Sequence, residues 1–182
     1  MGVGGYASVY GVLKVLEERG RVRRGYFVSG LGAAQFALPG AVDRLRQVRD
    51  PAYDGPEAVP PPTVVLTATD PAQPYGAALA WPESAGRPAR IGAAVVILRD
   101  GRPLAWFDRR SHHLVTFPDT ATDAGWADAL TDQVHSGRLR RVEVRKVDGE
   151  PLATSTVTAE VTAAAKAAGW IDGFKGLRGI HR

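Results

Sequence analysis

The chain opens with apolar residues at helical spacing. Four of them recur at positions i, i+3, i+4 and i+7: Val9, Val12, Leu13 and Leu16. Charged side chains such as Lys14 and Glu17 occupy other faces of the same stretch, and a glycine follows at position 20. This pattern predicts an amphipathic helix that ends at Gly20.

A hairpin and a second helix are expected next. Residues 21–27 alternate loosely and contain strand formers, glycines follow at positions 30 and 32, and an apolar stretch resumes over 33–37. Pro39 is suited to the first turn of a helix, whose buried face would carry Val42 and Leu45. A helix, a hairpin and a second helix in this order are typical of the end of a winged helix.

A proline-rich segment separates this N-terminal part from the rest of the chain. Five prolines between positions 51 and 62 remove backbone donors and favour extended conformations. We therefore predict three parts: the C-terminal part of a winged-helix domain over 1–49, a proline-rich linker over 50–63, and a β-barrel-like domain with helices over 64–182.

Beyond the linker, short apolar runs alternate with tight turns. Strands are expected over 64–66, 91–98, 103–108, 114–117 and 142–147, and helices over 126–136 and 158–168. The Asp100-Gly101 dipeptide is typical of a two-residue hairpin turn. The predicted fold class is α+β: a partial winged helix followed by a small, partly open antiparallel β-barrel with two flanking helices.

Composition limits the chemistry that the chain can perform. It has 182 residues, of which 45% are hydrophobic, enough for one ordinary domain or two small ones. The absence of cysteine excludes disulfides, a thiol nucleophile and cysteine-ligated metal sites. The N-terminus lacks the pattern of a signal peptide, and no window has the run of apolar residues that a spanning helix needs. We therefore expect a soluble, cytoplasmic protein with no membrane partner.

Positive charge is concentrated near the N-terminus. Residues 1–49 hold eight Lys and Arg against three Asp and Glu, whereas residues 50–182 hold fifteen against sixteen. Arginines on a hairpin can lie along a phosphate backbone, although a solvated surface is the alternative interpretation. The candidate nucleic-acid-binding residues are Arg21, Arg23, Arg24, Tyr26, Arg44 and Arg46.

Longer motifs resemble a known family. Residues 4–46, which include GGYASVY and RRGYFVSGLGAAQFALPGAVDRLR, and residues 68–82, ATDPAQPYGAALAWP, resemble the C-terminal end of Lhr, the large helicase-related proteins of bacteria. GAAVVILRDGRPLAWFDRRSHHLVTF and SGRLRRVEVRKVDGEPL resemble later parts of the same region.

The resemblance implies a superfamily 2 ATP-dependent DNA helicase tied to DNA repair, in which a motor core precedes winged helices and a terminal β-barrel. This sequence contains no G-x-x-x-x-G-K-[ST] stretch and no DEAD/DEAH-like box. We therefore expect a nucleic-acid-binding accessory module that does not hydrolyse ATP and holds no cofactor, since ATP and Mg²⁺ would belong to the parent motor core. We also expect the chain to begin inside the winged helix, which would leave the apolar face of the first helix short of partners.

The expected partners follow from the same resemblance. They are DNA, an RNA–DNA hybrid, the rest of an Lhr chain or its winged-helix domains, and further copies of this chain. A structural module that mediates oligomerisation is accordingly one alternative function.

Whether the chain is itself an enzyme stays open, because some relatives of this region are associated with DNA glycosylase activity on uracil or alkylated bases. Base excision needs a group that orients water or stabilises the developing positive charge. The candidate catalytic residues are Gln35, Asp70, Asp108 and Asp172. Three of the four have a structural alternative: Gln35 would bond neighbouring backbone, Asp70 would cap a turn, and Asp108 would form a surface ion pair.

No metal site is expected. His112 and His113 are adjacent, so on a strand their side chains would point to opposite faces. The tryptophans at strand and helix positions are expected in the core rather than at a binding surface.

Overall fold

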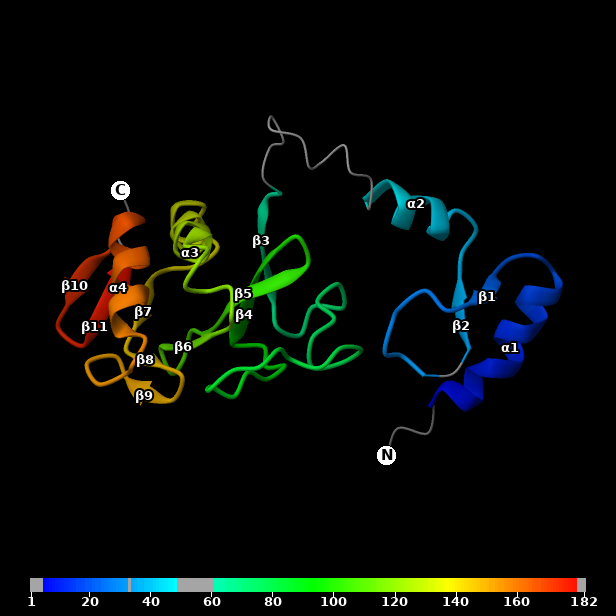
Figure 1. Cartoon of the computed structure of the whole chain (residues 1–182), viewed down its shortest axis with the longest axis horizontal. Coiled ribbons are helices and arrows are strands. Elements are labelled where there is room, and N and C mark those ends of the chain that lie inside the picture. Colours follow the sequence, from blue (N-terminus) through cyan, green and yellow to red (C-terminus); the bar gives the residue numbers. More distant parts are fainter. Residues whose placement is uncertain (1–4, 33, 49–60, 180–182) are drawn as a thin grey trace. The chain divides into compact units, whose positions relative to one another are not determined.

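The computed structural model describes residues 5–32, 34–48 and 61–179, and the chain divides into two compact units, Met1–Pro60 and Pro61–Arg182 (Figure 1). Most of the predicted linker, residues 50–63, lies outside the described residues. The described parts contain four helices and strands in three sheets, so the α+β class is confirmed.

The first unit is a helix, a two-stranded hairpin and a second helix. Helix α1 spans Tyr6–Glu18, strands β1 (Arg23–Gly25) and β2 (Gln35–Ala37) pair antiparallel, and α2 spans Ala41–Val48. Helix α1 contacts the hairpin through aromatic rings, because the ring centroids of Tyr10 and Phe36 lie 6.1 Å apart. The predicted order of elements is confirmed.

The exposure of α1 agrees with the expectation that its apolar face would be short of partners, whereas the predicted burial of Leu45 on α2 is wrong. No described residue of α1 is buried, and Val12 is 62% exposed. Leu45, which was expected on the buried face of α2, is 52% exposed. Amphipathic spacing thus predicted the helices correctly, but the described residues of this unit do not supply enough apolar surface to cover their faces.

The second unit is built on a six-stranded sheet with the order β3-β4-β5-β6-β8-β9. Its strands are β3 (Thr63–Thr67), β4 (Ala94–Arg99), β5 (Arg102–Asp108), β6 (His113–Thr116), β8 (Lys146–Val147) and β9 (Glu150–Pro151). The turn from β4 to β5 uses positive φ at Asp100 and Gly101, as the predicted two-residue hairpin requires.

A three-stranded sheet and two helices complete this unit (Figure 1). The sheet has the order β10-β11-β7, from Ile171–Gly173, Gly176–Gly179 and Val142–Val144. Helices α3 (Gly125–His135) and α4 (Thr158–Ala167) lie close to the predicted bounds, and the glycines that follow them at 137 and 169 have positive φ.

Strand β4 explains how the core is divided. Val95 and Ile97 pack into a cluster with α3, α4 and the three-stranded sheet, whereas Val96 and Leu98 pack into a second cluster on the other face. Trp81, from the loop between β3 and β4, packs against this second cluster. Because both faces of the strand are covered, its sequence is a continuous apolar run rather than an alternation.

Three details of the predicted β domain need correction. None of the sheets among the described residues closes on itself, so a barrel is not confirmed, and β6 and β8 pair in parallel. The strand predicted over 142–147 breaks at Arg145 into β7 and β8, which belong to different sheets. One continuous strand would place Val144 and Val147, three residues apart, on opposite faces of a sheet. The break at Arg145 allows both side chains to be fully buried in the same core cluster. Strands β10 and β11 were not predicted.

Among the described helices, none combines the length and the apolar character needed to cross a membrane.

Candidate nucleic-acid interface

The hairpin of the first unit carries the predicted arginines at its surface. Arg23 and Arg24 lie on β1, opposite Ala37 and Phe36 of β2, and Arg21 precedes the strand. All three arginines are exposed. Because neighbours on a strand point to opposite faces, Arg23 and Arg24 present their guanidinium groups to solvent on opposite faces of the hairpin.

Gln35 organises the loop that connects the two strands. Its Oε1 accepts hydrogen bonds from the amides of Phe27 and Val28, both at 2.8 Å. Its Nε2 donates to the carbonyls of Val28 at 2.9 Å and Leu31 at 3.0 Å. All four hydrogen bonds of the Gln35 side-chain amide are made with backbone groups of the loop. Bonding to neighbouring backbone was the structural role predicted from the sequence as the alternative to a catalytic one.

The arginines differ in how far acids neutralise them. Arg24 Nε lies 3.4 Å from Glu17 Oε1 of α1, and Arg46 Nη1 lies 3.4 Å from Asp43 Oδ1. Arg21, Arg23 and Arg44 form no ion pair within 4 Å with a described residue. These exposed pairs contribute little to stability, so Arg24 and Arg46 can exchange their acidic neighbours for a phosphate at small cost.

A small hollow joins the hairpin to α2. It has a volume of about 160 Å³, and Arg23 of β1 and Arg46 of α2 both line it. Tyr26, in the loop after β1, is 85% exposed and lies outside this hollow. The structure thus brings two of the six candidates to one concavity and leaves Tyr26 accessible to a base or sugar ring.

The three acidic candidates of the second unit hold local structure. Asp70 Oδ1 accepts the amide of Ala72 at 2.8 Å, as expected of a turn residue. Asp172 Oδ2 forms an exposed ion pair with Lys166 Nζ at 3.0 Å. No contact joins these acids to one another or to Asp108 among the described residues.

Asp108 caps the turn after β5 rather than forming the predicted ion pair with an arginine. It accepts the amide of Arg110 at 2.9 Å and the hydroxyl of Ser111 at 2.6 Å. Burial raises the pKa of its carboxyl, but these hydrogen bonds together lower the pKa below its ordinary value. Asp108 is therefore an ionised turn cap.

A second polar cluster, which the sequence reasoning missed, lies between β6 and the turn after β8. Asp148 accepts the amide of Thr116 at 2.8 Å and the hydroxyl of Thr116 at 2.6 Å. His113 Nε2 accepts the amide of Gly149 at 2.8 Å. The available signal was the Asp-Gly turn at 148–149, but sequence could not show which strand the turn would meet.

Burial lowers the pKa of His113 below its ordinary value of 6.5, and the nearby charge of Lys146 lowers it further. The carboxylates of Asp148 and Asp108 raise the pKa, but not enough to reverse the shift. The neutral ring fits its geometry, because Nε2 must keep a lone pair to accept the Gly149 amide. His112 lies in the preceding turn with positive φ, so the two histidines do not share a strand.

Comparisons with known proteins agree with this architecture. Residues 2–57 match the winged-helix domain of large helicase-related protein. A protein of Mycolicibacterium smegmatis named Lhr helicase/probable uracil glycosylase is 46% identical over 161 residues, which cover 86% of this chain and 10% of that protein.

The Lhr helicase/uracil glycosylase of Escherichia coli is 37% identical over 105 residues, covering 57% of this chain and 7% of that protein. The chain thus corresponds to a tenth or less of the length of these two relatives. Because the winged-helix match and both alignments point the same way, the chain belongs to the large helicase-related (Lhr) family, whose C-terminal region it resembles.

Proposed function

We propose that this chain is a nucleic-acid-binding accessory module of an Lhr-type DNA helicase. The observation that carries the proposal is the group of exposed arginines on the hairpin of a winged-helix domain, of which Arg21 and Arg23 lack acidic partners among the described residues. Such a group suits sequence-independent contact with DNA phosphates.

In this proposal each group has a separate task. Arg21, Arg23 and Arg24 contact phosphates, with Arg23 and Arg24 on opposite faces of the hairpin. Arg46 adds a phosphate contact at the hollow that it shares with Arg23, and Tyr26 packs on a sugar or base. Gln35 keeps the loop in shape without touching the nucleic acid. The module would position DNA for a motor in the intact protein, in a role connected with DNA repair, and the second unit would belong to the family's terminal β-barrel.

The test is a comparison of charge-neutral variants. We expect the double variant R21Q/R23Q to bind labelled DNA roughly tenfold or more weakly at 50 mM salt and to show a smaller salt dependence, because two phosphate contacts are lost. The control K14Q removes an exposed positive charge from α1 of the same unit and should bind like the parent chain. Equal affinity of R21Q/R23Q and K14Q would overturn the proposal.

A second candidate function is base excision, because the two relatives described above are named as uracil glycosylase or probable uracil glycosylase. Incubation of the chain with a uracil-containing strand, without ATP, followed by detection of abasic sites, tests it directly. If product forms, the variants Q35A, D70N, D108N and D172N separate a chemical role from the structural contacts described above. If the strand stays intact, this candidate is rejected for the chain.

A further inference from the structure

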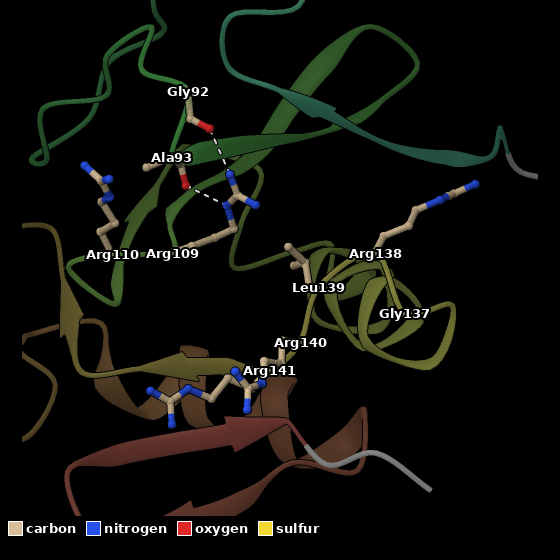
Figure 2. A pocket seen from close by; sticks show the side chains of 9 residues that line it. All are labelled: Gly92, Ala93, Arg109, Arg110, Gly137, Arg138, Leu139, Arg140 and Arg141. Atoms are coloured by element: carbon tan, nitrogen blue, oxygen red, sulfur yellow. Dashed lines mark hydrogen bonds between the residues drawn. The ribbon is translucent and has the colours of Figure 1, made fainter.

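A large cleft in the second unit is lined by arginines from separate segments. It has a volume of about 1040 Å³ and lies between the turn after β5 and the segment from α3 to β7. Figure 2 shows Arg109 and Arg110 on one side and Arg140 and Arg141 on the other, with Arg138 at a third position on the rim. Within the part of the chain that the structure describes, no acidic side chain lines this cleft.

Most of this charge is available to a ligand. Arg109 is held in place, because its Nε donates to the Ala93 carbonyl and its Nη2 to the Gly92 carbonyl, both at 2.8 Å (Figure 2). The other four arginines are exposed, and none forms an ion pair within 4 Å with a described residue. Guanidinium groups that surround a concave surface and have no ion-pair partner within 4 Å favour a polyanion.

The basic surface continues beyond the cleft. Arg141 also lines an adjoining hollow of about 340 Å³, together with Lys175 and Arg178 of the β10–β11 hairpin. Glu143 in this hollow is paired with Arg145, whose Nη2 lies 2.6 Å from Glu143 Oε2. The cleft and the hollow therefore form one basic track that passes Arg141.

An exposed aromatic ring stands at the end of this track. Phe174 lines the hollow at the turn between β10 and β11, and it is 99% exposed. A phenylalanine in this position contributes nothing to the core of the unit. Basic grooves that carry exposed aromatic rings are typical of proteins that bind single-stranded nucleic acid, because phosphates follow the charges while unpaired bases stack on the rings.

We propose that this track is a second nucleic-acid site, specific for single-stranded DNA, in which phosphates occupy the arginine cleft and a base stacks on Phe174. The site goes beyond the hairpin contacts proposed above, since it belongs entirely to the other unit. Preference for a single strand follows from the ring, because a base inside a duplex has no free face to offer.

The charge part is tested on the full chain with R140Q/R141Q and the control R87Q, which removes an exposed arginine of the same unit outside the track. The probe is a labelled oligothymidine. We expect R140Q/R141Q to reduce the slope of log affinity against log salt by about 1.4 in magnitude, because each phosphate contact with a single strand contributes about 0.7. R87Q should leave both affinity and slope unchanged.

The stacking part is tested with F174A and the conservative variant F174Y, on a strand containing 2-aminopurine, whose fluorescence falls when the base stacks. We expect F174A to bind at least about fivefold more weakly, with the salt slope unchanged and the fluorescence change lost. F174Y should restore both affinity and quenching.

Each outcome has a separate meaning. The inference is overturned if R140Q/R141Q behaves like R87Q, or if F174A keeps the parent affinity. It is also overturned if R21Q/R23Q, in which the hairpin contacts are weakened, binds duplex as tightly as the single strand. Loss of binding only on changing Arg21 and Arg23 would overturn this inference alone and leave the proposed function intact. If the parent chain binds no DNA, both proposals are rejected.

Discussion

Replacement of Gln35 by alanine should loosen the hairpin loop of the first unit. The side chain makes four hydrogen bonds to backbone groups of Phe27, Val28 and Leu31, and alanine removes all of them. A net contribution of about 0.5–1.5 kcal/mol for each bond gives roughly 2–6 kcal/mol if nothing replaces them. The site is only half-buried, so water would satisfy part of the loss, and we expect about 2 kcal/mol in the free energy of local opening.

Native-state hydrogen exchange measures this change at the amides concerned. A loss of about 2 kcal/mol corresponds to a roughly 30-fold faster exchange of the Phe27 and Val28 amides. The variant Q35E is the matched comparison, because it keeps the acceptor for both amides and loses the two donated bonds. The tryptophans at 81, 106, 126 and 170 all belong to the second unit, so their fluorescence should not change.

Q35A exchange rates within about threefold of the parent rates at both amides would contradict this prediction. An unchanged loop would mean that Gln35 does not hold the hairpin together. Gln35 would then return to consideration as a functional residue.

Three further predictions concern the second unit. Leu130→Ala should lower the free energy of unfolding by about 2–5 kcal/mol in urea titrations followed by tryptophan fluorescence, because Leu130 is fully buried in the larger core cluster. Gly176→Ala should destabilise the unit by about 2 kcal/mol or more in the same assay, since a Cβ there would lie 2.0 Å from the Val144 carbonyl oxygen; parent-like stability would contradict the strand pairing. The free energy of unfolding should decrease as the pH is lowered from about 7.5 to about 5.5. The pKa of His113 is lower in the folded state than in the unfolded state, so below about pH 6.5 the unfolded state binds more protons. His113→Gln should reduce this decrease.

Local sequence patterns were sufficient for the elements that are stabilised locally. Helices α3 and α4 have apolar periodicity and a glycine at the end, and the β4–β5 hairpin has its Asp-Gly turn, so each could be located within a few residues. The hydrogen bonding of Gln35 to neighbouring backbone was also anticipated, because its partners lie only four to eight residues away in the sequence.

Features that depend on distant pairing could not be predicted in the same way. The break at Arg145 is fixed by partners on either side, since β7 pairs with β11 and β8 with β6. The odd spacing of Val144 and Val147 was the available signal. Strands β10 and β11 contain only seven residues, of which Gly173, Gly176 and Gly179 are glycine, so propensity gave no strand signal.

The arginine cleft could not be predicted from net charge counted over a long segment of sequence. Residues 50–182 are nearly neutral as a whole, with fifteen basic against sixteen acidic side chains. Folding brings together the basic side chains at 109–110 and 138–141, while the acids nearby are engaged elsewhere: Asp108 caps a turn and Glu143 pairs with Arg145. Net charge over a long segment therefore says little about the local potential at a cleft.

The salt dependence of DNA binding by the intact chain tests most directly whether the exposed arginines contact phosphates. Fluorescence anisotropy of a labelled oligonucleotide, titrated at several salt concentrations between 50 and 200 mM, gives the slope of log affinity against log salt. The four phosphate contacts proposed for the first unit predict a slope of about −2.8 for a single strand and about −3.6 for a duplex, and the second site would make the single-strand value steeper. Binding that is absent at 50 mM salt, or that does not change across this range, would contradict the account.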